Sequence, residues 1–262
     1  MRNTLRWDNL NREELKKLAE EQAIVVIPTG STEQHGPALA VGSDAIIITK
    51  IAEGVAEEVN RRGKKCIVAP TIAYANSIHH MSFCGTITLQ PTTYMQMLKE
   101  ICMCIAKHGF RKIILINGHG GNTDPNNVAL IDINETLGFS VFHVGFWAGG
   151  EEDLASVTET QPNGTYHACE GETSLLLACD ETLVDPSYKH LSGPLVKEGY
   201  PELARQVSTF HRMEFKTPNG IIGNTYAATR EKGERMIAFS IKHLSDILCC
   251  DELWAECLED NK

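Results

Sequence analysis

A run of polar residues follows the first apolar stretch of the chain. Glu33 and His35 stand in the segment Thr29–Pro37, and Asp44 comes shortly after it. Because Glu33 and His35 are two residues apart, they point to opposite sides of an extended loop, so two neighbouring cations suit them better than one. The carboxylate of Asp44 could bridge two divalent ions, as in two-metal hydrolases. Each residue alone is better explained as part of a turn or helix cap, but the three together favour a metal site.

A glycine-rich turn follows a later apolar stretch and presents one imidazole. The segment Asn117–Asn122 reads Asn-Gly-His-Gly-Gly-Asn, with His119 in it. Its glycines allow positive φ angles and a close approach of the backbone to a ligand. A phosphate-binding loop would need the lysine and the spacing of a P-loop, which this segment does not have. Neutral imidazole is a common ligand of zinc, manganese and iron, so we interpret His119 as a metal ligand.

One imidazole and two carboxylates stand together just before a predicted helix. They belong to His167, Glu170 and Glu172. Glu172 could simply be a carboxylate at a helix N-terminus, where the helix dipole favours negative charge. The functional interpretation gives one carboxylate to a metal and leaves His167 to transfer protons.

Two adjacent histidines, His79 and His80, lie in a predicted irregular loop over residues 74–86. Loops of this kind often line functional sites. Adjacent histidines do not easily bind one ion, so we expect at most one of the two near a metal.

Short apolar stretches alternate with amphipathic ones along the chain. The predicted buried strands cover residues 23–28, 66–70, 112–117 and 139–145. The predicted helices cover 43–61, 92–109, 125–137, 172–178 and 230–247, and Ser43 or Asp44 would cap the first of them. This alternation predicts βαβ units and an open parallel sheet between layers of helices. Ligands bind beyond the carboxyl ends of strands in such sheets, where the segments with Glu33 and His119 begin.

The composition narrows the classes of partner and compartment. Of the 262 residues, 42% are hydrophobic, enough for a sizeable core, and the formal net charge is −10. A nucleic acid as the main partner would require a basic surface, so we expect a small-molecule substrate instead. We see no signal peptide and no apolar run long enough to span a membrane. Nine cysteines without a Cys-x-x-Cys pair favour buried free thiols in a reducing compartment, so we expect a cytoplasmic protein.

Taken together, these segments resemble the creatininase family of creatinine amidohydrolase-like proteins. The matching stretches are Pro28–Pro37, Asp44, His80–Thr86, Asn117–Asn122, His167–Ser174 and Gly223–Thr229 followed by Gly233. They span about residues 20–240, and the Glu-Gln-His-Gly-Pro and Asn-Gly-His-Gly-Gly-Asn sequences make the resemblance highly specific. The resemblance implies one α/β domain over residues 1–262, a three-layer α/β/α sandwich with a mostly parallel central sheet. It also implies a homo-oligomer, often a hexamer.

The same resemblance implies a dinuclear metal-dependent hydrolase that holds two divalent ions of zinc, manganese or iron. The ligands carried over from the family are Glu33 and His119 for one ion, His35 for the other, and Asp44 as the bridge. In the mechanism that the family shares, a hydroxide held by the metals attacks a carbonyl that a metal polarises. His167 or Glu170 would then pass the proton to the leaving group.

The second ion lacks one ligand of the family pattern. Creatininase has a glutamate in its Asn-Gly-His loop for this ion, where this chain has Gly121. A carboxylate of the segment 167–174 must then take its place. We expect Glu172 in this role, with Glu170 as the alternative.

Another departure concerns the substrate. Creatininase has a tryptophan four residues before the histidine that matches His167, where this chain has Asn163, which argues against creatinine; Trp147 is the candidate for an aromatic wall. Other family members act on a formamide of a ribosylated pyrimidine, a precursor peptide or an inosose. We expect an amidohydrolase that cleaves a C–N bond of a small polar amide, cyclic or open.

Two alternatives stay open. One is hydrolysis of a C–C bond in a cyclic diketone such as a dehydroinosose, which the low aromatic content of 6% favours weakly. The other is a non-catalytic family member, which should have broken metal ligands. All four carried-over ligands are intact in this chain.

Overall fold

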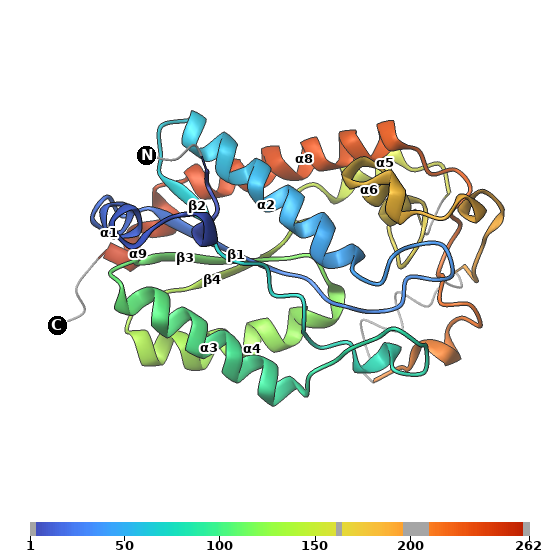
Figure 1. Ribbon diagram of the computed structural model, residues 1–262, viewed down its shortest axis with the longest axis horizontal. Helices are drawn as coiled ribbons and strands as arrows, with labels where there is room; N and C mark the ends of the chain where they lie inside the picture. The colour runs from blue at the N-terminus through green and yellow to red at the C-terminus, as the bar shows by residue number, and fades with distance from the viewer. Residues whose placement is uncertain (1–3, 161–163, 196–209, 259–262) are drawn as a thin grey trace.

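A sheet of four parallel strands forms the centre of the computed structural model, which describes residues 4–160, 164–195 and 210–258 (Figure 1). The strands are β1 (Ile24–Thr29), β2 (Cys66–Val68), β3 (Lys112–Asn117) and β4 (Phe142–Gly145), in the order β2-β1-β3-β4. β1 pairs with β3 along its whole length, from Ile24 opposite Lys112 to Thr29 opposite Asn117. This register brings the carboxyl ends of the two central strands side by side.

Helices cover both faces of the sheet (Figure 1). One face carries α2 (Ser43–Arg61), α5 (Glu151–Val157), α6 (Glu170–Cys179) and α8 (Arg230–Cys249), and the other carries α3 (Pro91–Lys107) and α4 (Thr123–Leu137). α1 (Arg12–Glu20) precedes β1, and α9 (Ala255–Leu258) ends the described chain. The predicted three-layer α/β/α arrangement with a parallel sheet is confirmed.

Alternate side chains of the strands enter two hydrophobic clusters, one on each face. Ile24 and Val26 belong to the cluster with α2, α6 and α8, whereas Val25 and Ile27 belong to the cluster with α3 and α4. All six residues of β1 are buried, as expected for a parallel strand covered on both faces. The helix α2 contributes one apolar stripe, consisting of Ile47, Ile48, Ile51, Val55 and Val59.

All the predicted strands and helices are present, with small shifts at their ends. The helix expected from residue 172 begins earlier, at Glu170. The expectation that Ser43 or Asp44 caps α2 was wrong, because α2 already begins at Ser43 and Gly42 precedes it. Asp44 therefore lies within the first helical turn and its carboxylate bonds outside the helix.

Three α-helices in the described part of the chain, α1, α5 and α9, were not predicted. A readable signal precedes α1: the side chain of Asn11 accepts hydrogen bonds from the Glu13 and Glu14 amides, each at 3.0 Å. The Glu14 carboxylate accepts from the Asn11 amide at 3.0 Å, which completes a capping box. The helix α5 has three acidic residues in its first turn after Gly150, which suits the helix dipole.

The remaining sequence expectations on cysteines and membranes have mixed outcomes. Within the described residues, no disulfide joins any of the nine cysteines, but only four of them are buried: Cys66, Cys102, Cys169 and Cys257. The expected burial was therefore only partly right. Among the helices that the structure describes, none is both long enough and apolar enough for a bilayer crossing.

Candidate metal centre

The carboxyl ends of β1 and β3 continue into two loops that are bonded to each other. Gly118 N donates to Thr29 O at 2.8 Å, and Thr29 Oγ1 donates to Asn117 Oδ1 at 3.1 Å. Asn117 Nδ2 donates to the carbonyl of His119 at 2.7 Å. Because these groups are buried, their bonds are protected from water and hold the two loops in one arrangement.

Asp44 lies between two histidines from different loops. Its Oδ1 is 3.1 Å from His35 Nε2, and its Oδ2 is 3.0 Å from His119 Nδ1. All three side chains are buried, yet Asp44 Oδ2 accepts no hydrogen bond from the described residues. Burial alone would raise the pKa of Asp44, but the two histidines hold it well below its usual value. The carboxylate is therefore ionised and faces a different histidine with each oxygen.

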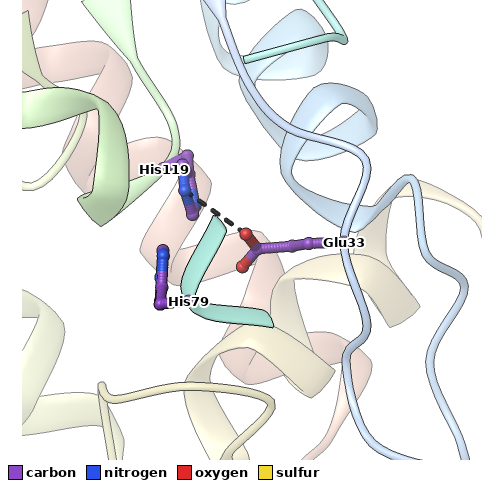
Figure 2. A group of neighbouring side chains, drawn as sticks. All are labelled: Glu33, His79 and His119. Atoms are coloured by element: carbon purple, nitrogen blue, oxygen red, sulfur yellow. Dashed lines mark ion pairs between the residues drawn. The ribbon is translucent and has the colours of Figure 1, made fainter. Parts of the chain in front are cut away.

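Glu33 lies beside His119 on one side of this cluster (Figure 2). Glu33 Oε2 is 3.3 Å from His119 Nε2 and accepts a hydrogen bond from Ser77 Oγ at 2.6 Å. Glu33 Oε1 is 3.2 Å from His80 Nε2. The ring of His79 stacks on that of His119, with 5.6 Å between centroids. Burial raises the pKa of Glu33 to about 7, although the charge of His119 opposes this shift.

Glu172 and His35 form the other side of the cluster. His35 Nδ1 donates to the carbonyl of Glu33 at 3.0 Å, so Nε2 is the ring nitrogen that faces Asp44 and Glu172. Glu172 Oε2 is 3.7 Å from His35 Nε2 and accepts a hydrogen bond from Ala168 N. Burial would lower the pKa of His35, but Asp44 raises it to about 10, and burial raises the pKa of Glu172 to about 7.

The residue that holds Glu172 has an unusual backbone conformation. Ala168 has a φ of +49°, in the left-handed region that non-glycine residues seldom adopt. Such local strain is concentrated at functional sites, where the surroundings enforce it. Here it directs the Ala168 amide at the Glu172 carboxylate.

Three carboxylates meet in this cluster: Glu33 and Asp44, which are buried, and Glu172, which is half-buried. Within the described residues, every ion-pair partner of these carboxylates is a histidine. Three sets of side chains have ligand atoms within 4.8 Å of one another: Glu33, His79 and His119; Glu33, His35 and His167; and His35, Asp44 and Glu172. Buried carboxylates are stable only when their charge is neutralised, and the unbonded Asp44 Oδ2 is the donor that a cation requires. The residues present therefore fit divalent metal ions.

The Gln34 amide determines which nitrogen of His80 carries the proton. Its Oε1 accepts a hydrogen bond from Gly36 N at 2.9 Å, which orients the amide group. Its Nε2 then donates to His80 Nδ1 at 2.8 Å and to the carbonyl of Gly220 at 3.2 Å. His80 consequently carries its proton on Nε2, facing Glu33, and burial lowers its pKa, which keeps it neutral.

The backbone of Gln34 likewise determines which ring nitrogen of His167 carries the proton. His167 Nε2 is 3.0 Å from both the Gln34 carbonyl and Gln34 Nε2. Both hydrogens of Gln34 Nε2 already bond to His80 Nδ1 and the Gly220 carbonyl, and a carbonyl can only accept, so His167 Nε2 donates to the Gln34 carbonyl. The other nitrogen, Nδ1, then carries a lone pair 3.7 Å from Glu33 Oε1 and 3.9 Å from Glu172 Oε2. Burial lowers the pKa of His167 well below its usual value. His167 is therefore a neutral imidazole with its basic nitrogen in the site.

A cavity of about 450 Å³ opens at the cluster, and Glu33, Asp44, His119, His167 and Glu172 all line it. Most of its remaining wall is apolar. Aromatic and aliphatic members of this wall include Phe146, Trp147, Tyr166, Leu154, Met213 and Met236. Trp147 thus lies where an aromatic wall was expected, whereas Asn163 lies outside the described residues.

Comparison with known proteins places the chain in a family. Residues 8–248 match the family model of creatininase, described as creatinine amidohydrolase. The chain belongs to the creatininase family. The match covers nearly the whole chain, including both loops of the buried cluster, and it confirms the resemblance found in the sequence.

Curated members of the creatininase family with different names are similar to this chain. A mycofactocin precursor peptide peptidase of Mycobacterium ulcerans (strain Agy99) is 31% identical over 82% of this chain and 80% of its own length. A creatinine amidohydrolase of Pseudomonas putida is 25% identical over 88% of this chain and 91% of its own length. A 3-dehydro-scyllo-inosose hydrolase of Thermotoga maritima is 31% identical over only 44% of this chain and 35% of its own length.

Solved creatininase structures have the same fold. One creatinine amidohydrolase structure is 23% identical, has a TM-score of 0.78, and the comparison covers 94% of this chain and 97% of the other. A structure named for manganese creatininase gives a TM-score of 0.78 at 21% identity, over 94% of this chain and 98% of the other. At this level of identity the agreement concerns the fold.

The loop with His119 leaves no room at Gly121 for the glutamate that creatininase has there. A Cβ atom at Gly121 would lie 2.4 Å from His119 Nε2, 2.6 Å from the carbonyl of Asn76 and 2.7 Å from a carbon of the His79 ring. A glutamate therefore has no room at this position. The carboxylate that the structure brings to His35 and Asp44 is that of Glu172.

Glu170 lies outside the cluster. The resemblance to creatininase had suggested it as the alternative ligand of the second ion and as a proton carrier. The buried carboxylate of Glu170 accepts hydrogen bonds from the Glu159 amide at 3.0 Å and the Thr160 amide at 2.8 Å. Lys232 Nζ is 2.6 Å from Glu170 Oε1. The structure does not bring Glu170 to the cluster, because its oxygens are already occupied by these partners. It joins α6 to α8 and to the segment before residue 161.

Replacement of Glu170 by glutamine should lower the free energy of unfolding by about 2 kcal/mol at neutral pH. The half-buried Lys232 would lose one of its two carboxylate partners and keep only Glu159. Burial would raise the pKa of Glu170, but Lys232 and the other donors lower it below its usual 4.5. Since the native pKa is depressed, this stabilisation is present above about pH 4.5 and is lost as the pH falls through the native pKa. Urea unfolding of the unchanged chain and of Glu170→Gln, at neutral and at acidic pH, measures the difference in their free energies of unfolding. An unchanged difference at the lowest pH would contradict this account.

Proposed function

We propose that this chain is a dinuclear divalent-metal hydrolase that cleaves a C–N bond of an amide. The observation that carries the proposal is the position of Asp44, whose two oxygens face His35 and His119, each about 3 Å away. A carboxylate with one oxygen toward each of two histidines is the arrangement expected of a ligand that bridges two ions.

The donors divide into two sets around this bridge. Glu33 and His119 would hold one ion, with His79 close enough to join them, and His35 and Glu172 would hold the other. Imidazole and carboxylate ligands suit zinc, manganese and iron, and related solved structures are named for manganese and zinc forms of creatininase. Bound divalent ions would lower the pKa of a water molecule and polarise a carbonyl group.

The residues of the chain divide the remaining work of hydrolysis. His167 presents its unprotonated Nδ1 to the site between Glu33 and Glu172, so it can take a proton and return it to the leaving nitrogen. Its hydrogen bond to the Gln34 carbonyl holds the ring in that orientation. The buried position of the cluster excludes bulk water and strengthens each of these interactions.

The wall of the cavity favours an amide over a polyol ring. A substrate rich in hydroxyl groups needs a wall rich in hydrogen-bonding partners, whereas this wall is largely aromatic and aliphatic. Although the aromatic content of the whole chain is only 6%, three aromatic residues line the cavity: Phe146, Trp147 and Tyr166. A relative of 31% identity is named as a peptidase, and one of 25% identity as an amidohydrolase. Both names describe cleavage of C–N bonds.

Replacement of Gln34 by leucine, which has a similar size, should lower kcat about 10- to 100-fold while metal content stays the same. Leucine cannot donate to His80 Nδ1, so His80 loses the bond that sets its tautomer toward Glu33. Elemental analysis and steady-state kinetics of the purified variant measure both effects. Loss of metal together with activity would show instead that Gln34 serves mainly to hold the loop.

The test of the proposed function combines metal analysis with a substrate screen. The purified chain should contain two equivalents of zinc, manganese or iron, and should hydrolyse at least one member of a panel of short peptides, N-acyl amino acids, creatinine and formamidopyrimidine nucleosides. Less than one equivalent of metal, even after zinc or manganese is added, would refute the dinuclear site. Turnover of oxidised inositols alone would favour the C–C hydrolase instead.

A further inference from the structure

A single lysine lies on the wall of the cavity. Among the described residues that line the cavity, Lys216 is the only lysine or arginine. It follows a short 3-10 helix, Met213–Phe215, which packs against the 3-10 helix Ile78–His80 that carries His79. Lys216 is therefore on the same side of the cavity as the Glu33, His79 and His119 group.

Within the described part of the chain, no carboxylate forms an ion pair with Lys216. Glu214, two residues before Lys216, instead accepts a hydrogen bond from Ser82 Oγ at 2.6 Å and lies 3.9 Å from Arg212. Lys216 is exposed on the wall of the cavity, so its ammonium group is open to a ligand that enters the cavity. Partial desolvation lowers its pKa.

The charge of Lys216 reaches toward the metal cluster. Burial, with the charges of His119 and Lys216, lowers the pKa of His79 to about 4. Met213, three residues before Lys216, also lines the cavity. A ligand with an amide at the cluster and an apolar body along this wall would therefore place its far end near the lysine.

We propose that Lys216 binds a carboxylate of the substrate, so that the preferred amides carry a free carboxylate separated from the cleaved bond by an apolar group. This inference rests on the proposed hydrolase function, because it assigns one end of the substrate to the metal cluster. A single ammonium group matches a carboxylate with one negative charge. A phosphate ester with two charges fits less well, since the exposed Glu151 also lines the cavity.

The test compares 4-phenylbutyrate with 4-phenylbutanol, which share an apolar body and contain no amide to hydrolyse. Calorimetry on the zinc-loaded chain should give a Kd at least about tenfold lower for the carboxylate. Lys216→Met should remove this preference, leaving at most a twofold difference, and Lys216→Arg should retain most of it. The matched control is Lys16→Met, since Lys16 is exposed on α1; it should behave like the unchanged protein.

Three results would overturn the inference. They are equal binding of the two compounds, no binding of either, and a preference for the carboxylate that survives in Lys216→Met, which would mean that the carboxylate binds the metals instead. Elemental analysis of the same samples distinguishes a failure of the Lys216 inference from a failure of the proposed function. A chain with two metals but no dependence on Lys216 contradicts only the inference, whereas a chain that holds no metal contradicts the proposed function.

Discussion

Asp44→Asn should remove both metal ions and lower kcat/KM by roughly a thousandfold or more. The amide that replaces the carboxylate has no negative charge, and its NH₂ group would direct hydrogens at one of the two metal positions. Asp44 Oδ1 faces His35 and Oδ2 faces His119, so neither metal set keeps its full ligands. Loss at both sites from one substitution is the property that distinguishes a bridge from a ligand of one ion. Elemental analysis should fall from two equivalents to below one.

The matched control is Asp124→Asn. Asp124 is the second residue of α4, just as Asp44 is the second residue of α2, and both helices begin at the same edge of the sheet. Asp124 is exposed, however, so its replacement should leave metal content and kcat/KM within about twofold. Circular dichroism should confirm that both variants fold. If Asp44→Asn retained one full equivalent of metal, Asp44 would serve only one ion.

The main features of the site could be predicted because they follow from chain order. Each strand of a parallel sheet ends at the same edge, so the segments after β1 and β3 had to meet there. Strand β1 leads to Glu33 and His35, and strand β3 leads to His119. All residues of β1 are buried, so its sequence is a continuous apolar run up to Pro28. The end of that run marks the edge of the sheet where the site lies.

The choice between Glu170 and Glu172 could not be made from the pattern alone. Two residues along a helix turn the side chain by about 200°, so one carboxylate faces the sheet edge and the other faces α8. Which one faces the edge depends on where α6 packs, and the partner that binds Glu170 is Lys232, 62 residues away. The role of Gln34 was missed for the same reason. The hydrogen bonds of its side chain go to His80 and Gly220, which are distant in the sequence. The position of Gln34 between two predicted metal ligands, Glu33 and His35, was the available signal.

Glu172→Gln should reduce the metal content from two equivalents to one and lower kcat/KM at least a hundredfold. The glutamine keeps the size of the side chain but loses the charge that neutralises the second ion beside His35, 3.7 Å away. Glu33 and His119 are untouched, so the first ion should remain. Titration of the metal-free variant with zinc, followed by calorimetry, should show one tight site where the unchanged chain has two.

Two further variants decide whether Glu172 has replaced the glutamate of creatininase. Glu170→Gln, two residues away on the same helix, should keep both metals although it weakens the fold, because its carboxylate binds Lys232. The double variant Gly121→Glu, Glu172→Gln restores the carboxylate position of creatininase and should still fail to recover the second metal. A side chain at residue 121 would meet His119 Nε2 at 2.4 Å from its first carbon, so it would displace a ligand of the first ion. Recovery of two metals in the double variant would show that the loop can rearrange to hold a glutamate at residue 121. The second ion could then be bound by a carboxylate at either residue 121 or residue 172.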